Sequence, residues 1–328
     1  MSTAPQRFSA TATERRRVAV IGAGSVGTAV AYACLIRGSA GALALYDVNA
    51  DKVRSEVLDL NHGRQFVPHC TVEGSDDIAV IAGSAVVVVT AGAKQHPGQS
   101  RLDLAGNNVA MARDLTPQVL EHAPDAVIVV VTNPVDVVTY AVARTADGAP
   151  ARVFGSGTVL DSGRFRFLIA ERANVNVGNV HAVIVGEHGD SEIPLWSSVS
   201  IGGLPADRFR TADGTAVFDP ATRQEISADV VNAAYQIIAG KGATNLAIGL
   251  SAARIVEAVL GDQHRIMPVS TVQRGAYGIS GVALSLPTVV SAGGAGQVLE
   301  VPLSTAELDG LRESATALRA VAESLGLS

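Results

Sequence analysis

The sequence predicts an α/β protein in which a doubly wound parallel sheet is followed by an α+β domain. A chain of 328 residues, 48% of them hydrophobic, buries a large core and usually divides into two domains. In the first half, short apolar runs alternate with segments of helical periodicity, the pattern of right-handed βαβ units. In the second half this alternation gives way to long helical segments and two β-rich stretches.

The elements of the first half follow from the periodicity of apolar residues. Continuous apolar runs indicate strands that are buried on both faces, as in a parallel sheet. These predicted strands cover 18–21, 42–46, 71–72, 85–89 and 126–131. Apolar residues at helical spacing predict the connecting helices at 26–37, 51–61, 104–121 and 135–145. The alternation places helices on both faces of one sheet.

The elements of the second half differ in kind and order. The predicted elements are a helix at 159–173, strands at 180–185 and 195–201, a helical region at 223–260 interrupted at 240–242, and β-rich stretches at 266–273 and 281–290. The last helix, 305–325, begins with a capping box, since Ser304 is followed three residues later by Glu307. The change of pattern near Val153 predicts a boundary between a first domain, 17–152, and a second domain, 153–328. Residues 1–16 are expected to form a flexible tail, and an arm onto another subunit is the alternative.

Composition argues against several classes of protein. The net charge is −6 and no basic face interleaved with aromatic residues occurs, so nucleic acid is not an expected partner. Cys34 and Cys70 give neither a disulfide framework nor metal-ligand spacing, so we expect no metal and two reduced thiols in a cytoplasmic protein. The first residues lack the apolar core of a targeting signal, and the longest apolar runs are too short to span a membrane.

A glycine-rich motif, GAGSVG, lies between the first predicted strand and the helix after it. Here Gly22 suits a tight turn, Gly24 a close approach of backbone to a pyrophosphate, and Gly27 the packing of helix on strand. Asp47 ends the second predicted strand, where a carboxylate accepts hydrogen bonds from an adenosine ribose and repels a 2′-phosphate. The combination predicts a Rossmann domain that binds NAD rather than NADP; a glycine-rich turn followed by an Asp helix cap is the alternative. The residues expected to contact NAD are Gly22, Gly24, Ser25, Val26, Gly27, Asp47 and Asn133.

Polar residues also follow the predicted strand at 126–131, in the motif TNPVD. Asn133 offers both a donor and an acceptor, which suits a substrate hydroxyl or a nicotinamide amide at the carboxyl end of a parallel strand. Pro134 favours an unusual backbone, such as a cis bond. An ordinary turn with a helix cap is the alternative interpretation.

Three residues with acid–base or anion-binding chemistry stand in two later segments. His188 follows an apolar strand among glycines, where an imidazole is open to close approach and exchanges protons near neutral pH. Asp161 is the partner that we expect to hold its tautomer. Arg164, one helical turn after Asp161, shares its face and can hold a carboxylate with two parallel hydrogen bonds. Taken singly, a helix cap, a surface arginine and a loop histidine are equally good interpretations.

The segment 95–101 lies between an apolar strand and a helix start, which predicts a mobile loop over the nucleotide-binding edge. It combines hinge residues with Gln95, a neutral amide, and Arg101, whose charge is permanent. Such a loop can close over a small substrate, polarise it with Arg101 and contact its side chain with Gln95.

The chain resembles the L-lactate/malate dehydrogenase family from about Arg17 to its last helix. The segments that carry the resemblance are GAGSVG, LYDVN, TAGAKQHPGQSRLDL, TNPVD, GTVLDSGRFR, NVHAVIVGEHGDSEIPLWS, KGAT and LSLPTVV. The resemblance implies that His188 is the proton donor and acceptor and that Asp161 orients it. It further implies that Arg101 polarises the substrate carbonyl and that Arg164 grips the substrate carboxylate.

The resemblance also places Gln95 where a malate dehydrogenase of this family usually has arginine. A neutral amide leaves the second carboxylate of oxaloacetate unpaired, so pyruvate and L-lactate are the expected substrate and product. Asn133 and Thr244 are implied to line the substrate and nicotinamide site. A malate or other 2-hydroxy-acid dehydrogenase, and a non-catalytic NAD-binding sensor, are the alternatives.

Two further residues indicate regulation. Arg166 lies two residues after Arg164 and therefore points away from the substrate face, and His181 begins the strand that leads to His188. In bacterial lactate dehydrogenases activated by fructose 1,6-bisphosphate, matching residues bind the effector phosphates across a subunit interface. The resemblance thus implies a homotetramer with this effector, whereas two scattered polar residues at an interface are the simpler interpretation.

Overall fold

The computed structural model describes residues 16–93, 101–146 and 150–327, apart from the side chains of Arg101 and Pro150. All but the last residue of the tail predicted at 1–16 therefore lies outside the described residues. The strands of the first half are β1 (Arg17–Ile21), β2 (Ala42–Tyr46), β3 (Thr71–Ser75), β4 (Val86–Val89), β5 (Val127–Val130) and β6 (Val153–Gly155). The helices between them are α1 (Ser25–Arg37), α2 (Ala50–His62), α3 (Arg101–His122) and α4 (Val135–Thr145).

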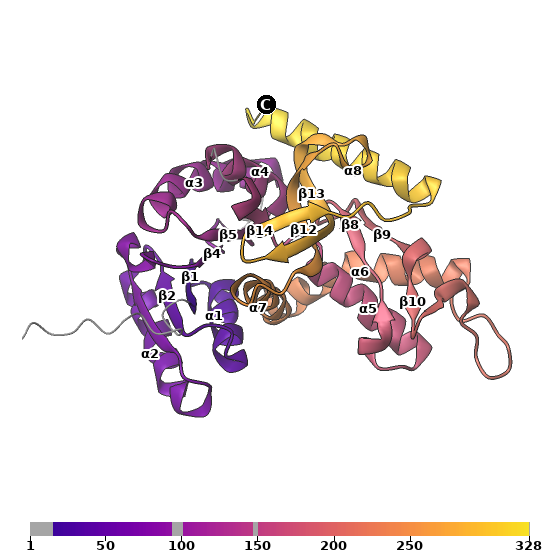
Figure 1. Cartoon of the computed structure of the whole chain (residues 1–328), viewed down its shortest axis with the longest axis horizontal. Coiled ribbons are helices and arrows are strands. Elements are labelled where there is room, and N and C mark those ends of the chain that lie inside the picture. The colour runs from indigo at the N-terminus through magenta and orange to yellow at the C-terminus, as the bar shows by residue number, and fades with distance from the viewer. Residues whose placement is uncertain (1–15, 94–100, 147–149, 328) are drawn as a thin grey trace, which may run out of the picture.

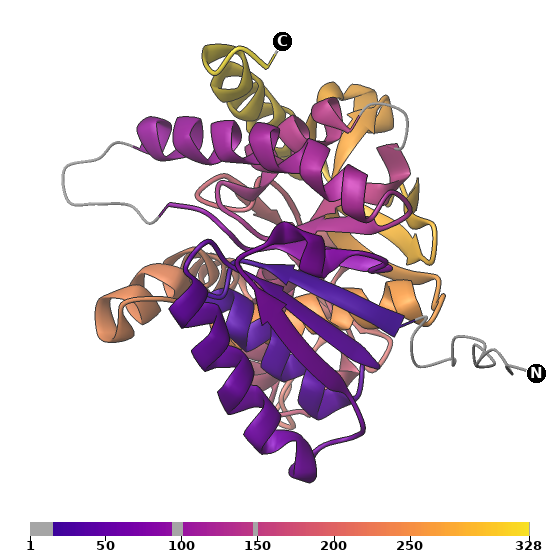
Figure 2. The same ribbon diagram turned by 90° about the vertical axis from the view of Figure 1, so that its left-hand side faces the viewer.

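These strands form a parallel sheet in the order β3-β2-β1-β4-β5-β6, that of a doubly wound nucleotide-binding fold (Figures 1 and 2). Successive residues of β1 point to opposite faces, so Val18 and Val20 lie in one hydrophobic core and Ala19 and Ile21 in another. Helices α1 and α2 cover the first face, and α3 and α4 cover the second. This burial on both faces accounts for the continuous apolar runs, and the predicted fold class is confirmed.

The parallel sheet extends further than the sequence indicates. β6 was not predicted, because a run of three residues is too short to show a period. It pairs with β5 in parallel register, so the sheet continues to Gly155, past the boundary placed after residue 152.

The second half contains longer strands and the remaining helices. Its helices are α5 (Val159–Ala173), α6 (Pro220–Lys241), α7 (Leu246–Leu260) and α8 (Thr305–Ser324). Its strands are β7 (Val180–His181), β8 (Ile184–Gly186), β9 (Glu192–Pro194), β10 (Ser200–Ile201), β11 (Leu204–Pro205), β12 (Arg265–Arg274), β13 (Ser280–Ser291) and β14 (Gly294–Val298).

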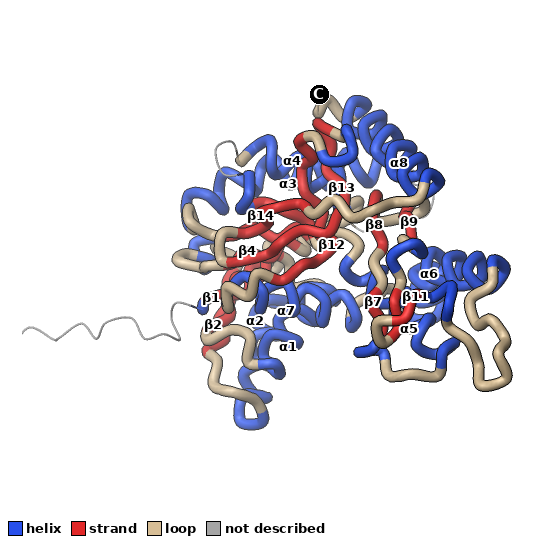
Figure 3. The backbone as a smooth tube through the Cα atoms, turned by 45° about the vertical axis from the view of Figure 1, so that its right-hand side comes forward, coloured by secondary structure: helices blue, strands red, loops and turns tan. Residues whose placement is uncertain are grey.

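The sheet of the first half continues into the second half without a break. β12 pairs antiparallel with β6, β13 and β8 follow, and β9 forms the edge, while β14 pairs with β13 (Figure 3). A smaller sheet has the order β11-β10-β7. Helix α7 belongs to the second half by sequence but packs on α1, where a Cβ on Gly249 would stand 2.7 Å from the backbone of Ala29. One continuous sheet and the packing of α7 on α1 therefore join the two halves.

The predicted strand at 195–201 is wrong over most of its length. Trp196–Ser198 forms a 3₁₀ turn, and only Ser200–Ile201 forms a strand. Glu307 of α8 accepts hydrogen bonds from the Ser197 backbone N–H (3.0 Å) and hydroxyl (2.6 Å), which holds the turn in place. This contact spans 110 residues of sequence, so local periodicity could not show it.

The other predictions for the second half agree more closely with the structure. The helical region 223–260 divides into α6 and α7 at Gly242, whose φ of 82° ends the first helix. The capping box of Ser304 and Glu307 is present at the start of α8. None of the helices in the described part of the chain combines the length and the apolarity needed to cross a membrane.

Candidate active site

The glycine turn between β1 and α1 is shaped by close packing. Gly22 has a φ of 98°, which L side chains rarely adopt, and a Cβ there would stand 2.7 Å from the backbone nitrogen of Ala91. A Cβ on Gly27 would lie 1.8 Å from the carbonyl oxygen of Gly22. Gly24 differs, because the nearest atom to a Cβ there would be Lys52 Nζ at 3.8 Å. The space beside Gly24 and the N-terminus of α1 is therefore open to a pyrophosphate.

Asp47 joins the end of β2 to this turn. Its Oδ2 accepts a hydrogen bond from the Ala23 N–H (2.7 Å), and its Oδ1 accepts one from the Asn49 N–H (3.0 Å). Lys52 Nζ lies 3.7 Å from Oδ2. Each carboxylate oxygen has two lone pairs, so ribose hydroxyls can still donate to Asp47. The residues of this edge fit the adenosine half of a dinucleotide.

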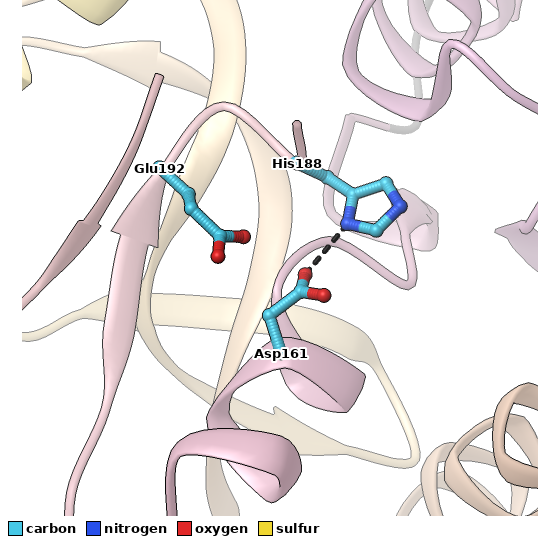
Figure 4. A group of neighbouring side chains, drawn as sticks. All are labelled: Asp161, His188 and Glu192. Atoms are coloured by element: carbon cyan, nitrogen blue, oxygen red, sulfur yellow. Dashed lines mark hydrogen bonds and ion pairs between the residues drawn. The ribbon is translucent and has the colours of Figure 1, made fainter. Parts of the chain in front are cut away.

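His188 and Asp161 meet from the β8–β9 loop and from α5 (Figure 4). His188 Nδ1 lies 2.6 Å from Asp161 Oδ2, and the other ring nitrogen points away from the carboxylate. The Asp161 side chain is 2% exposed and that of His188 is 24% exposed. Because Nδ1 faces the carboxylate, Nε2 is the nitrogen that can exchange a proton with a ligand.

Arg164 lies one turn further along α5 and contacts the same carboxylate. Its Nη1 donates a hydrogen bond to Asp161 Oδ1 at 2.8 Å. One oxygen of Asp161 therefore faces the imidazole and the other faces the guanidinium. The structure thus brings together the three residues that the sequence singled out in two separate segments.

Asp136 holds the backbone of the histidine loop, and sequence reasoning did not identify it. This buried residue of α4 accepts a hydrogen bond from the His188 N–H (2.7 Å) on Oδ2 and from the Ser270 hydroxyl (2.5 Å) on Oδ1. The motif TNPVD contains Asp136, so a signal existed. Nothing local indicates that its partners lie 52 and 134 residues further along the chain.

A second bridge joins the ends of β4 and β5. The side chain of Asn108, buried in α3, accepts a hydrogen bond from the Ala93 N–H (2.8 Å) and donates one to the Asn133 carbonyl oxygen (2.7 Å). The Asn133–Pro134 peptide bond is cis, and Asn133 is exposed. Asn108, which sequence reasoning also missed, therefore sets the position of Asn133 relative to the end of β4.

The charges of the histidine centre follow from burial and from its ion pairs. Burial alone would lower the pKa of His188, but the Asp161 carboxylate outweighs it and raises that pKa to about 9. Burial would raise the pKa of Asp161, yet the imidazolium and Arg164 lower it. At neutral pH the imidazole is therefore protonated and the carboxylate ionised. Burial raises the pKa of Asp136 to about 6, against its hydrogen bonds from Ser270 and His188.

A third carboxyl group, that of Glu192, stands next to the pair (Figure 4). Glu192 begins β9, opposite Gly186 of β8. One ligand atom each from Asp161, His188 and Glu192 lies within 4.8 Å of the others. Glu192 Oε1 is buried and has no hydrogen-bond partner within the described ranges. Sequence reasoning did not single out this residue.

The remaining predicted residues lie around or outside this centre. Gln95 lies outside the described residues, and Arg101 begins α3 with its side chain outside the description. Thr244 is half-buried between α6 and α7. Arg166 Nε donates a hydrogen bond to the Ala182 carbonyl oxygen (2.7 Å), next to the exposed His181.

Two family models together match almost the whole chain. The model described as lactate/malate dehydrogenase, NAD binding domain, matches residues 16–155. The model described as lactate/malate dehydrogenase, alpha/beta C-terminal domain, matches residues 158–325. The prediction of NAD as cofactor is thereby confirmed.

Similar proteins cover nearly the same length. L-lactate dehydrogenase of Bifidobacterium animalis subsp. lactis is 48% identical over 311 residues, 94% of this chain and 97% of that protein. L-lactate dehydrogenase A of Hordeum vulgare is 48% identical over 307 residues, 92% of this chain and 85% of that protein. Among solved structures, a minor L-lactate dehydrogenase from Enterococcus mundtii in its ligands-bound form has a TM-score of 0.91 at 35% identity. That match covers 95% of this chain and 98% of the other.

Proposed function

The chain belongs to the lactate/malate dehydrogenase family, and on that premise we propose that it is an NAD-dependent L-lactate dehydrogenase, interconverting pyruvate and L-lactate. The observation that carries the proposal is the protonated imidazole of His188, held by Asp161 beside the Arg164 guanidinium. A protein that only senses NAD needs no such proton donor. The activities of the similar proteins support the same function.

In this proposal the residues of the centre divide the work of one reduction. NADH, when bound, supplies the hydride. Arg164 binds the carboxylate of pyruvate, and Arg101 polarises the carbonyl from the start of α3. His188 Nε2 donates its proton to the carbonyl oxygen, which becomes the hydroxyl of lactate. Asp161 stabilises the imidazolium before this transfer and keeps Nε2 directed at the substrate.

The preference for pyruvate over oxaloacetate is assigned to Gln95. A carboxylate closed against a neutral amide costs several kcal/mol, and about 1.4 kcal/mol changes a rate tenfold. The test is the loss of NADH absorbance with pyruvate, oxaloacetate and longer 2-oxo acids. We expect kcat/KM to be at least about 100-fold higher for pyruvate than for oxaloacetate. Preference for oxaloacetate or a longer acid would instead indicate another 2-hydroxy-acid dehydrogenase, and no turnover at all would indicate a sensor.

Replacing Gln95 tests the assignment directly. Gln95→Arg supplies a cation for the second carboxylate and is expected to move the ratio of kcat/KM towards oxaloacetate by about 100-fold or more. Gln99→Arg is the matched control, because it adds the same charge to the same segment four residues further on. An unchanged ratio in Gln95→Arg, or an equal change in both variants, would remove Gln95 from the site.

We also propose that Arg166 and His181 bind a phosphate of fructose 1,6-bisphosphate across a subunit interface. Support comes from the hydrogen bond of Arg166 to the carbonyl oxygen of Ala182, the residue that follows the exposed His181. An anion there would offset repulsion between like charges of two copies and favour the active assembly. The sugar bisphosphate is expected to lower the KM for pyruvate, and His181→Gln to abolish this effect. An effect of equal size from inorganic phosphate alone would argue against a specific effector.

Self-association to a homotetramer is part of the same proposal. Large apolar side chains are exposed around a cavity of about 700 Å³ between α1, α2 and α7. They are Tyr32, Ile36, Phe66 and Leu246. Because monomers rarely expose such contiguous surface, a second copy is expected to cover it. The molar mass from light scattering checks the assembly, and a monomer would contradict it. The cytoplasmic location stays a prediction from the sequence.

A further inference from the structure

Glu192 has no role in the reaction proposed above, although its carboxyl group lies against the residues that carry it out (Figure 4). We infer that Glu192 is a positioning residue: its carboxyl group stays neutral, so that Asp161 is the one ionised carboxylate that pairs with the imidazole ring. It acts through His188 rather than on the substrate. The inference rests on the proposed function in one respect, namely that His188 Nε2 donates a proton to the substrate.

The geometry around Glu192 favours a proton on its carboxyl group. Asp161 has both oxygens engaged, one by His188 Nδ1 and one by Arg164 Nη1, so it is the carboxylate that stays ionised. Glu192 Oε1, by contrast, is buried without a hydrogen-bond partner in the described part of the chain. An ionised carboxylate in that position would face a second carboxylate with no donor to that oxygen, which is costly. Protonation removes the charge that causes both costs.

The same three residues could hold a metal ion by distance alone, but their partners oppose this. A metal would have to bind Asp161, whose oxygens already face two cationic groups. The Arg164 guanidinium, 2.8 Å from Asp161 Oδ1, would also repel a second cation. A proton on Glu192 neutralises this third carboxyl group and leaves the charges of Asp161 and His188 unchanged.

Among the described residues, the charged groups that act most strongly on Glu192 come from two elements. Helix α5 contributes Asp161 and Arg164, and the β8–β9 loop contributes His188 and Asp190. Burial raises the pKa of Glu192 to about 8 and Asp161 acts in the same direction, against His188 and Arg164. The imidazole itself is faced by Asp136 of α4 as well, and α8 presents the hydroxyl of Ser314 to the Glu187 N–H.

A neutral Glu192 gives the centre a useful charge. The ion-paired side chains of Asp161, Arg164 and protonated His188 then sum to one positive charge, which suits a ligand that brings a single carboxylate. The charge of Asp136 is outside this sum, because that carboxylate binds the His188 backbone N–H and the Ser270 hydroxyl. If Glu192 ionises, that net charge is lost, and the new anion favours the imidazolium and raises the pKa of His188. The two groups therefore lose their protons in coupled steps as the pH rises.

The test is a titration of the His188 ring in the full chain without substrate. Hydrogen–deuterium exchange at the imidazole C2 carbon, followed by mass spectrometry of fragments that contain His188 but not His181, reports its apparent pKa. Glu192→Gln keeps the size and polarity of the neutral carboxyl group but cannot ionise. We expect the apparent pKa of His188 to fall by about 1 unit or more in this variant. Glu187→Gln, on the same loop, is the matched control and is expected to shift it by less than about 0.3 units.

An unshifted titration of His188 in Glu192→Gln overturns the inference. In turnover, the variant is expected to move the alkaline limb of the kcat/KM profile to lower pH, whereas a merely structural defect lowers the rate at every pH. Infrared spectra of the unaltered protein give a second test, independent of whether the variant folds. The carbonyl band of a protonated carboxyl group must be present at pH 7 and must weaken above about pH 8, and its absence at pH 7 overturns the inference.

The ring titration and the infrared test use no pyruvate, so the two proposals can fail separately. A shifted His188 titration in a protein that reduces no 2-oxo acid would keep the role of Glu192 and reject the dehydrogenase. Reduction of pyruvate without any shift in the titration would keep the dehydrogenase and reject the role of Glu192.

Discussion

The glycine turn at 22–27 contains no side chain that titrates, whereas the centre around His188 packs several ionisable side chains together: Asp136, Asp161, Arg164 and Glu192. The turn depends on the absence of side chains at two glycines, since a Cβ on Gly22 or Gly27 would collide with the backbone. The centre depends on charges that offset one another in a buried place. The first is therefore sensitive to volume and the second to protonation, and substitutions in the two regions are expected to fail in different ways.

The largest expected effect separates the two regions most clearly. His188→Ala removes the proton donor and is expected to lower kcat for pyruvate by about 10²- to 10⁴-fold. The dissociation constant of NADH, measured by fluorescence titration, is expected to stay within about threefold, because the glycine turn and Asp47 are untouched. His69→Ala, at an exposed histidine, is the control and should change neither quantity. Loss of NADH binding in step with activity would show that the regions are not independent.

A smaller effect divides the glycine turn itself. Gly27→Ala would place a Cβ 1.8 Å from the Gly22 carbonyl oxygen and is expected to destabilise the fold by about 3 kcal/mol. Gly24 has a φ of −78° and open space in front of it, so Gly24→Ala should change stability by less than about 0.5 kcal/mol. Its new methyl group should nonetheless weaken NADH binding by occupying the space for the pyrophosphate. Melting temperature and NADH titration measure both, and equal destabilisation would contradict this division.

The contrast between the two regions also explains what the sequence could predict. The turn lies within six consecutive residues, and each glycine has a reason that local geometry supplies, so GAGSVG and Asp47 could be identified. Asp161 and Arg164 share a helix face, so their proximity followed from helical spacing. Asp136 could not be assigned to His188, because the backbone hydrogen bond between them joins α4 to a loop 52 residues away. Tertiary packing alone decides such contacts.

The same limit applies to Glu192, Asn108 and the segment around Trp196. Glu192 reaches the centre because β9 turns back along β8, and strand register cannot be deduced from a run of three residues. Asn108 bridges two strand ends from the interior of a helix, where an asparagine has no local signature. Trp196 has strand-like neighbours, but the Glu307 carboxylate accepts a hydrogen bond from the Ser197 backbone N–H, and this contact stabilises a 3₁₀ turn instead of a strand.

The smallest expected effect concerns Asp136. Its ionised carboxylate holds the His188 loop in place but lowers the stability of the folded chain. Burial raises the pKa of Asp136 from 3.8 to about 6. Between these pH values the folded chain holds the proton more tightly than the unfolded chain, so unfolding releases it and stability falls as the pH rises. The cost is absent below about pH 4, complete above about pH 6, and on the order of 2 kcal/mol.

Asp136→Asn removes that cost and is therefore expected to be more stable than the native chain at pH 7 by about 2 kcal/mol, with the difference vanishing near pH 4. Urea unfolding across this range measures it, and Asp51→Asn, whose side chain is 94% exposed, is the control that should show no such trend. Turnover should fall about tenfold, because the amide has only one oxygen and can replace the acceptor of either the His188 N–H or the Ser270 hydroxyl, whereas the carboxylate accepts from both. A gain in stability of equal size at both ends of the pH range would mean that volume rather than charge holds the histidine loop. The histidine loop would then depend on side-chain volume, as the glycine turn does, and the distinction between the two regions would be lost.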